Sequence, residues 1–400
     1  MGGRVRAILK KKSSEIIMKP VFYLLSASLV LACLQPWVKA APSLFSLKNE
    51  SHQTVAQIAP ENFFKIGPAR LAKQHLETSP VQLAAVARST LAYLEKHAQD
   101  DAEAVHAGLF GSLGVSLDQV KATLAFLVRT VEEDQAAKRP FRLNDPAFLE
   151  QHFRFFDWKA DQKNAAAHKV KVSDQRIRLT KYVVFEAAGS PVKTAQQNCA
   201  LYALPKEEAQ LSADEAEQEK SRLIRYRFSK QQVVAGAVDK LGVKPLVWVS
   251  RQGLEDALMQ GSLMVRMNDG KMRMFNVHRN NGIGYDRKIK DPRQQRRYWY
   301  FKEVAGIQGY GKDEKIIVQP AVTVAGDVFN LGLGKLVALR YPLQGKPVMR
   351  LAILADTGGA FIPNLYQLDY LAGVFPDREA FRKGVQHLPE YAEASVLLLK

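Results

Sequence analysis

The chain has 400 residues, of which 47% are hydrophobic, and a formal net charge of +17. A chain of this length and composition can bury a large apolar core, so we exclude intrinsic disorder and expect two or three domains. The positive charge favours an anionic partner such as nucleic acid, an acidic membrane or a cell-wall polymer, but charge alone does not choose among them.

The N-terminal residues have the layout of a secretory signal peptide. Lysines precede an uncharged, mostly apolar stretch from Val21 to Leu34, which is too short to span a bilayer. Val38 and Ala40 offer small residues at the two positions that a signal peptidase reads. We therefore predict that residues 1–40 are removed and that the protein is exported to the periplasm, which argues against a nucleic-acid partner.

A second processing route is also compatible with this segment. Val30-Leu31-Ala32-Cys33 resembles a lipoprotein cleavage box, in which Cys33 would be acylated and would anchor the protein in the outer membrane. Leu31 makes the match weaker, so we favour soluble export. Either route leaves Cys199 as the internal cysteine, and we expect no disulfide.

Helical patterns dominate the chain up to residue 168. Apolar residues recur at helical spacing from Ser79 to His97, with Ser79 as the N-cap. A second helix is predicted to begin at Ser116, which forms a capping-box pattern with Gln119. A third is predicted from about Asp145 to Trp158. Its inward-facing residues would be Phe148, Leu149, Phe153 and Phe156.

Beyond Lys169 the pattern changes to short β-rich runs separated by turn residues. The clearest predicted strands are Tyr182–Phe185, Leu246–Val249, Leu263–Met267 and Leu351–Leu354. The polar, acidic residues 206–220 predict a solvated loop or short helix. A last helix, capped by Ser229, is predicted from Ser229 to Leu241.

The sharpest local signal is Asp356, in the run from Ile353 to Gly359. This carboxylate ends an apolar strand, and Gly358 and Gly359 let the backbone turn away tightly. Burial by its own strand is expected to raise the pKa of Asp356 toward a value useful for general acid catalysis. An aspartate that merely caps its own turn is the alternative.

Aspartic proteases carry an Asp-Thr-Gly of this kind after an apolar pair. Their chemistry requires two such carboxylates that share a proton. The chain contains no second Asp-Thr-Gly, and it is long for half of a homodimeric site. This class is therefore the weaker of the two enzyme classes that use such a layout.

The second class is the lytic transglycosylase A family, and the resemblance to it is extended. Asp327, Asp356 and Asp369, each in its local run, look like the three ordered aspartates of the family's C-terminal part. Other segments that resemble the family's motifs, in family order, are Leu201–Pro205, Met259–Ser262, Val265–Met267, Asp269-Gly270, Asn281-Gly282 with Tyr285, and Tyr300–Glu303. Together they cover roughly residue 146 to the C-terminus.

This chain departs from the family pattern at several positions. Val184 replaces a motif glutamate, and Leu263 replaces the last glycine of Gln-Gly-Ser-Gly. Gly332 and Gly334 stand where the family has Pro and Gly. These changes affect the predicted substrate contacts more than the acid, so a glycan-binding module of the same fold with weakened activity is the alternative.

The resemblance implies an α+β fold with an N-terminal helical region and a double-psi β-barrel that carries an inserted smaller β domain. The expected divisions are 1–40 signal peptide, 41–168 helical region leading into the barrel, 169–300 inserted β-rich domain with part of the barrel, and 301–400 C-terminal part of the barrel. It also implies a monomeric lytic murein transglycosylase without a cofactor, acting on peptidoglycan glycan strands.

The resemblance further implies roles for individual residues. Asp356 would be the single catalytic acid and base, and Asp327 and Asp369 would be supporting carboxylates, although both could equally be loop caps. The substrate groove would be lined by Tyr182, Gln260, Gly261, Ser262 and Asn281. Tyr182 could equally be a core aromatic.

Three other features favour plain interpretations. The eight histidines are dispersed without metal-ligand spacing, so we predict no metal site. The run Leu331–Lys335 lacks the spacing of a phosphate loop. The basic, aromatic run Arg287–Tyr300 is best explained in an exported protein as a solvated face that attracts the anionic groups of peptidoglycan.

Overall fold

The computed structural model describes residues 59–400 except residues 70, 72, 73, 287, 313, 359, 360, 362 and 363. The predicted signal peptide and Cys33 lie outside these residues and stay predictions. The strands are β1 (Phe64–Gly67), β2 (His75–Leu76), β3 (Phe153–Trp158), β4 (Ile177–Ser190), β5 (Cys199–Tyr202), β6 (Pro245–Val249), β7 (Ser262–Met267), β8 (Met272–Asn280), β9 (Trp299–Val304), β10 (Thr323–Ala325), β11 (Leu336–Leu343), β12 (Lys346–Asp356), β13 (Gln367–Phe375) and β14 (Tyr391–Leu399).

Helices of various lengths connect these strands, and the fold is mixed α+β. The α-helices are α1 (Pro80–Lys96), α2 (Leu117–Ala136), α3 (Pro146–His152), α4 (Gln162–Ala167), α5 (Ala213–Gln218), α6 (Lys230–Val234), α7 (Arg251–Gln260), α8 (Val328–Leu331) and α9 (Arg378–Val385). Short 3-10 turns occur at Pro60–Asn62, Gly108–Leu113, Arg142–Asn144, Lys206–Glu208, Ile224–Tyr226, Asp239–Leu241 and Pro292–Gln294.

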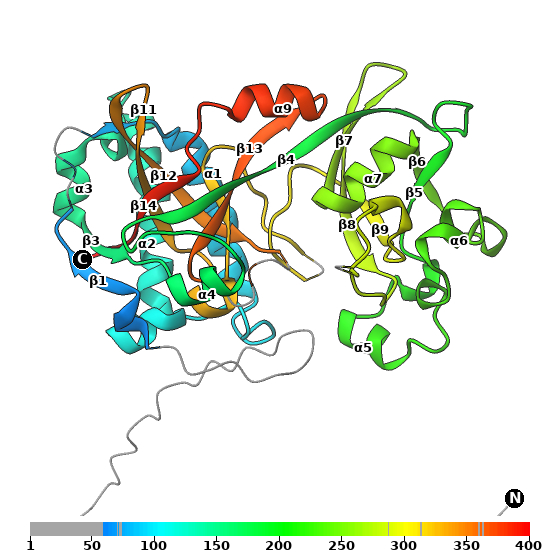
Figure 1. Cartoon of the computed structure of the whole chain (residues 1–400), viewed down its shortest axis with the longest axis horizontal. Coiled ribbons are helices and arrows are strands. Elements are labelled where there is room, and N and C mark those ends of the chain that lie inside the picture. The colour runs from blue at the N-terminus through cyan, green and yellow to red at the C-terminus, as the bar shows by residue number, and fades with distance from the viewer. Residues whose placement is uncertain are drawn as a thin grey trace, which may run out of the picture. The chain divides into compact units, whose positions relative to one another are not determined.

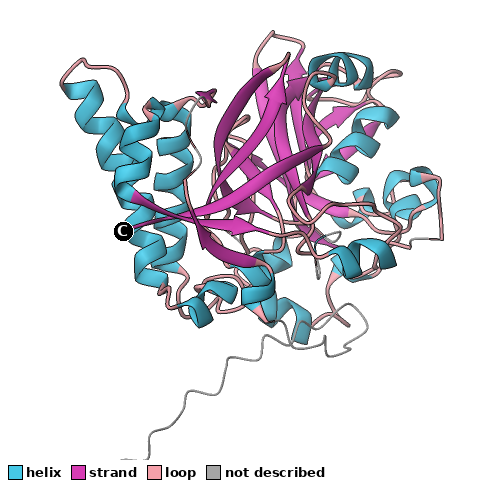
Figure 2. Cartoon of the chain, turned by 60° about the vertical axis from the view of Figure 1, so that its left-hand side comes forward, coloured by secondary structure: helices cyan, strands magenta, loops and turns pink. Residues whose placement is uncertain are grey.

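The first two predicted helices are confirmed. Ser79 caps α1 by accepting a hydrogen bond from the backbone N–H of Gln82. Ser116 and Gln119 form the reciprocal capping box that starts α2. The two helices pack against each other, and they also contact strands β12 and β14, so they lie beside the sheet (Figure 2).

The third predicted helix is wrong over its second half. Helix α3 ends at His152, and the aromatic residues from Phe153 onward form strand β3. This strand pairs with β1 and with β14, both antiparallel. The backbone hydrogen bonds of two neighbouring strands, together with the high strand propensity of Phe and Trp, outweigh the helical spacing of Phe153 and Phe156.

The four predicted strands are confirmed, and each lies within β4, β6, β7 or β12. The predicted helix from Ser229 is shorter than expected. It ends at Val234, because Gly236 adopts a left-handed φ of +89° and turns the chain. Residues 206–220 form a 3-10 turn and α5, as predicted.

Six strands of the described chain form a closed circuit of pairings. In order around the circuit they are β4, β13, β10, β12, β11 and β14. β14 closes it by pairing antiparallel with the start of β4, through Tyr391 with Arg178 and Ala392 with Ile177. β4 continues beyond the circuit and pairs in parallel with β7, which begins the run β7, β8, β9.

Buried apolar side chains of the described residues gather into two clusters. The first cluster lies among α1, α2 and the circuit strands, and the second lies among β5 to β9 and α7. Strand β4 belongs to both, since Val184 is in the first cluster and Phe185 is in the second. Figure 1 shows β4 running from the strands around β13 and β14 to β5, β6 and β7. Among the described helices, none is long and apolar enough to cross a membrane.

Candidate active site

Asp356 is the last residue of β12, as the sequence predicts. Its side chain is partly buried, beside Ala325 at the end of the parallel strand β10. One carboxylate oxygen, Oδ1, accepts a hydrogen bond of 2.8 Å from the backbone N–H of Thr357. The other, Oδ2, accepts one of 2.9 Å from the phenol of Tyr182. Asp356 therefore has a fixed orientation at a strand end.

The surroundings of Asp356 favour its protonated form more than water does. Burial raises the pKa of Asp356 to about 6, against the opposing effects of the Thr357 N–H, the Tyr182 hydroxyl and the charge of Lys315. A carboxyl with a pKa in this range can give up a proton and take it back near neutral pH. The prediction of a raised pKa is confirmed.

Tyr182 comes from β4 and packs against the first apolar cluster. It is thus a partly buried aromatic whose polar end reaches Asp356. Burial raises the pKa of Tyr182 well above its ordinary value, and the neighbouring charge of Asp356 adds to the effect. The phenol therefore stays protonated and remains a hydrogen-bond donor to the carboxylate.

Asp369 lies on β13, paired with Thr180 of β4 on one side and with Ala325 of β10 on the other. The pKa of Asp369 is raised to about 6, mainly by burial, with the charge of Asp356 acting in the same direction and the Thr180 hydroxyl opposing it. Within the described residues, its buried Oδ1 atom has no hydrogen-bond partner. The structure therefore brings Asp369 into electrostatic contact with Asp356.

Asp327 is fully buried and caps α8. Its Oδ1 atom accepts a hydrogen bond of 3.1 Å from the N–H of Asn330, and Oδ2 accepts one of 2.9 Å from the N–H of Asn364. Burial raises its pKa to about 6. These contacts join α8 to the residues that follow the Asp356 turn, so Asp327 acts here as a loop cap.

The segment Gln260-Gly261-Ser262 joins α7 to β7. Gly261 ends the helix with a left-handed φ of +79°, and Gln260 is partly exposed. Ser262 is buried, and its hydroxyl accepts a hydrogen bond of 2.8 Å from the side-chain amide of Asn276. The same amide donates to the Gly261 carbonyl at 2.9 Å. Asn276, which the sequence analysis did not single out, therefore fixes this turn.

Asn281 is 1% exposed, and its amide is used within the fold. Its nitrogen donates to the carbonyls of Phe228 and Arg296 at 2.9 and 3.1 Å, and its oxygen accepts from the N–H of Tyr298 at 3.0 Å. Asn281 thus holds together the loop that precedes β9. Its predicted contact with substrate stays a prediction.

The two departures from the family pattern are core residues in this chain. Val184 is 2% exposed in the first apolar cluster, and Leu263 is 0% exposed in the second. Neither residue is therefore exposed to a ligand, and neither offers it a polar side chain.

The glycine-rich run Leu331–Lys335 is not a phosphate site. Lys335 is fully buried, and its ammonium nitrogen lies 3.4 Å from the carbonyls of Gly332 and Leu333. Gly332 has a φ of +72°, which proline cannot adopt, and a Cβ atom there would lie 2.1 Å from the His106 carbonyl oxygen. A residue with a side chain at this position would therefore be both strained and crowded.

Lys315 is the principal residue that the sequence analysis missed. Its ammonium donates to the side-chain oxygen of Asn276 at 2.8 Å and to the carbonyl of Val277 at 2.7 Å. Its charge also acts on Asp356. In the sequence it belongs to the charged stretch Lys312–Lys315, which is typical of a solvated loop.

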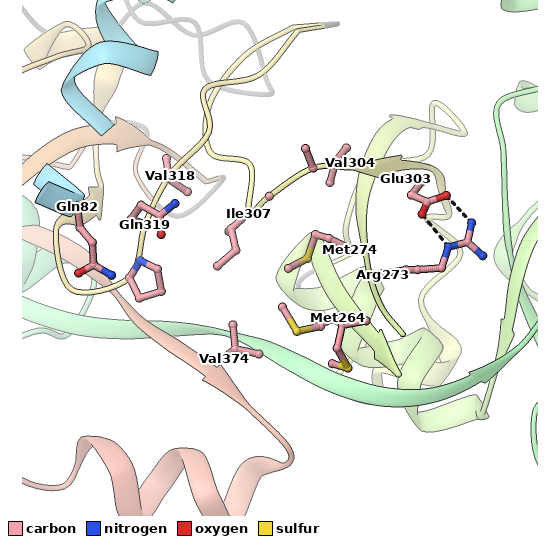
Figure 3. A pocket seen from close by; sticks show the side chains of 14 residues that line it. Gln82, Met264, Arg273, Met274, Glu303, Val304, Ile307, Val318, Gln319 and Val374 are labelled. Atoms are coloured by element: carbon pink, nitrogen blue, oxygen red, sulfur yellow. Dashed lines mark hydrogen bonds and ion pairs between the residues drawn. The ribbon is translucent and has the colours of Figure 1, made fainter. Parts of the chain in front are cut away.

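The described part of the chain also contains a pocket of about 590 Å³, and Asp356 is not among its lining residues. Its lining comes from α1, β7, β8, β9 and β13 and from the chain between β9 and β10, and Met264, Met274 and Val374 line its apolar part (Figure 3). Arg273 and Glu303 form an ion pair at one edge. The pocket's lining does not include Asp356, Tyr182, Gln260, Ser262 or Asn281. The predicted substrate groove therefore stays a prediction.

Comparisons with known proteins place the fold. No family model and no curated protein sequence matches this chain. Among solved structures, it is similar to a membrane-bound lytic murein transglycosylase from Agrobacterium tumefaciens, with a TM-score of 0.56, 17% identity and coverage of 86% of this chain and 96% of that one. It is also similar to MltA from Neisseria gonorrhoeae, with a TM-score of 0.52, 16% identity and coverage of 84% and 90%. The chain thus has the fold of the MltA-type lytic transglycosylases, as its motifs predict.

Proposed function

We propose that this protein is a peptidoglycan lytic transglycosylase and that Asp356 is its single catalytic acid and base. The observation that carries the proposal is the state of Asp356, a partly buried carboxyl with a pKa of about 6, held by Tyr182 at the end of a strand. The ordered motifs and the MltA-type fold support it. The bond cleaved would be the β-1,4 bond between N-acetylmuramic acid and N-acetylglucosamine.

The reaction can be written with one carboxyl group. Protonated Asp356 gives its proton to the glycosidic oxygen as the bond to muramic C1 breaks. The resulting carboxylate then takes the proton of the muramic C6 hydroxyl while that oxygen bonds to C1. A 1,6-anhydro ring closes, no water is consumed, and Asp356 regains its proton. A glycosidase of the ordinary kind would need two carboxyl groups at a defined separation.

The neighbours of Asp356 have complementary parts in this scheme. The phenol of Tyr182 and the N–H of Thr357 hold the carboxyl in place and stabilise it once it has lost its proton. Asp369 is a second carboxyl, and its negative charge disfavours loss of the proton from Asp356 before the substrate takes it. Gln260, Gly261 and Ser262 would bind the glycan strand, with Tyr182 and Asn281 as the remaining predicted contacts.

The same proposal extends to architecture and location. The closed circuit of six strands in the described chain would be the family's double-psi β-barrel, with β5 to β9 and α7 as the inserted domain. The protein would act in the periplasm as a monomer, either soluble after cleavage at Ala40 or anchored in the outer membrane through Cys33.

The decisive experiment is digestion of purified sacculi followed by mass spectrometry of the soluble products. Products with 1,6-anhydromuramic ends are expected from the wild-type protein and not from Asp356→Asn. Their absence from the wild-type digest would refute the enzymatic proposal. Their release by Asp356→Asn would refute the assignment of the acid.

A second candidate is a glycan-binding protein that has lost activity, and the burial of Val184 and Leu263 favours it. It predicts that sacculi retain the protein in a pull-down but yield no anhydro products. The third hypothesis is an aspartic protease. Such an enzyme would cleave protein substrates and be inhibited by a pepsin-type transition-state analogue, which distinguishes it from both glycan-binding candidates.

A further inference from the structure

The loop between β9 and β10 folds as a hairpin against the acid strand. Gln308 and Ile317 form a β-bridge across it. The backbone N–H of Tyr310 donates 2.9 Å to the carbonyl of Ala355, the residue directly before Asp356. A Cβ atom on Gly309 would lie 2.4 Å from that same carbonyl oxygen, so the approach of the loop is close. The loop and the end of β12 are therefore fixed relative to each other.

The N-terminal helical region braces this loop from its far side. The phenol of Tyr310 donates to one carboxylate oxygen of Asp101 at 3.1 Å, and the phenol of Tyr93 on α1 donates to the other at 2.7 Å. Asp101 is 2% exposed. The N–H of Ile317 donates to the hydroxyl of Ser89 at 2.8 Å. The helices thus give the loop a defined position beside Asp356.

Lys315 extends from this loop to the second apolar cluster's strands. Its ammonium donates to Asn276 and to the Val277 carbonyl of β8, and Asn276 in turn holds the turn formed by Gly261 and Ser262. One chain of hydrogen bonds therefore runs from the loop beside the acid to the segment that we expect to bind the glycan strand.

Two charged groups among the described residues act on Lys315. The groups that act on Lys315 are Asp356, which favours its charged form, and Lys302 of β9, which opposes it. Burial is the largest effect and lowers the pKa of Lys315 to about 8. The groups that act on Asp356 are Tyr182 of β4, Lys315 and the N–H of Thr357, and Asp369 of β13 is coupled to it by charge. Lys315 is thus cationic where Asp356 titrates.

We propose that Lys315 is a positioning residue for the reaction, whose ammonium, held by Asn276, stabilises the Asp356 carboxylate that forms when the acid gives up its proton. The same contact with Asn276 fixes the position of the Gly261-Ser262 turn relative to Asp356. The charge effect is a property of the fold, whereas its catalytic consequence rests on the proposed function.

The direct test is the titration of Asp356 in the full chain labelled with ¹³C at the aspartate carboxyl carbons. Comparison with Asp356→Asn identifies its resonance. In Lys315→Met the pKa of Asp356 is expected to rise by about one unit, because an opposite charge is lost. Lys315→Gln keeps donor groups for Asn276 without the charge and should give the same shift, which guards against misfolding of the methionine variant. Lys315→Arg keeps the charge and should restore the wild-type value.

Lys312→Met is the matched control, since it removes an exposed lysine of the same loop whose ammonium contacts the Asp100 carbonyl instead. It should leave the pKa of Asp356 unchanged. An unchanged Asp356 pKa in a folded Lys315→Met or Lys315→Gln protein, or an equal shift in Lys312→Met, would overturn the proposal.

The catalytic consequence is tested with sacculi across pH. Lys315→Met should move the alkaline limb of the rate profile up by about one unit and lower the plateau rate about three- to tenfold. Lys315→Arg should recover both. A wild-type protein that makes no anhydro products would refute the proposed function while leaving the carboxyl titration interpretable, so the two failures are distinguishable.

Discussion

The phenol of Tyr182 donates a hydrogen bond of 2.9 Å to the Oδ2 atom of Asp356, across 174 positions of sequence. Strand β4 supplies the phenol and strand β12 the carboxyl, with β13 and β10 between them in the sheet. The contact therefore depends on the order of strands in the sheet. It also makes Tyr182 the residue whose removal should affect the acid most directly.

Tyr182→Phe removes this hydrogen bond and leaves the ring in place. A hydrogen bond to a charged group contributes roughly 1.5–3 kcal/mol, and partial exposure of the site places the effect at the lower end. The pKa of Asp356 should rise above about 6, since the bond favours the carboxylate. The plateau rate of anhydromuropeptide release should fall about tenfold.

Tyr370→Phe is the control for loss of a buried hydroxyl. Its phenol donates to the Ala321 carbonyl and accepts from Arg350, not from the site. This variant should be less stable but keep the wild-type pH profile. A Tyr182→Phe profile that matches wild type would contradict a role for this hydrogen bond.

Asp369→Asn tests the charge coupling between the two carboxyls. Removal of a like charge favours ionisation of Asp356, so its pKa should fall by less than about one unit and the alkaline limb should move to lower pH. This direction is opposite to that expected for Tyr182→Phe. Carboxyl ¹³C titration measures it, and an upward shift would show that Asp369 acts on the acid by some means other than its charge.

Lys335→Met should stabilise the protein at neutral pH. Burial lowers the pKa of Lys335 to about 7, whereas an unfolded lysine titrates near about 10.4. The unfolded chain therefore binds more protons between these values, and this lysine makes stability increase as pH rises from about 7 to about 10. Methionine has a similar length and no charge, so the substitution removes the cost of burying the ammonium. The free energy of unfolding should rise by about 2 kcal/mol at pH 7.

Urea unfolding at pH 7 and pH 9 measures both effects of Lys335→Met. The variant should gain stability at pH 7 and gain less at pH 9. A destabilised variant would mean that the contacts of the lysine with the Gly332 and Leu333 carbonyls outweigh its desolvation.

A pair of variants separates structural from substrate-binding roles among the predicted groove residues. Asn281→Ala leaves buried carbonyls and an N–H without partners and should lower the free energy of unfolding by about 2–3 kcal/mol. Gln260 lies at the partly exposed end of α7, so Gln260→Ala should change the free energy of unfolding by less than about 0.5 kcal/mol. Equal thermal stability of the two variants would contradict the structural role of Asn281.

The activity of Gln260→Ala tests its predicted contact with substrate. If Gln260 binds glycan, this variant should release product more slowly at low sacculus concentration.

Much of the local structure was predictable because its causes are local. Ser79 and Ser116 start helices through hydrogen bonds to residues three positions away, and Asp356 ends a strand because an apolar run stops at a glycine-rich turn. The ordered aspartates also pointed to the fold that the solved structures share.

What the sequence alone left open was decided by contacts between distant residues. Phe153 begins a strand because β14 offers it backbone partners, and Asn281 is buried because the segments around Phe228 and Arg296 meet at its amide. Nothing in the sequence sets Lys315 apart from other charged loop residues, and only the fold brings its ammonium to Asn276 and its charge to bear on Asp356. Periodicity reports which residues share a face of one element, whereas the environment of a charge depends on which elements that face meets.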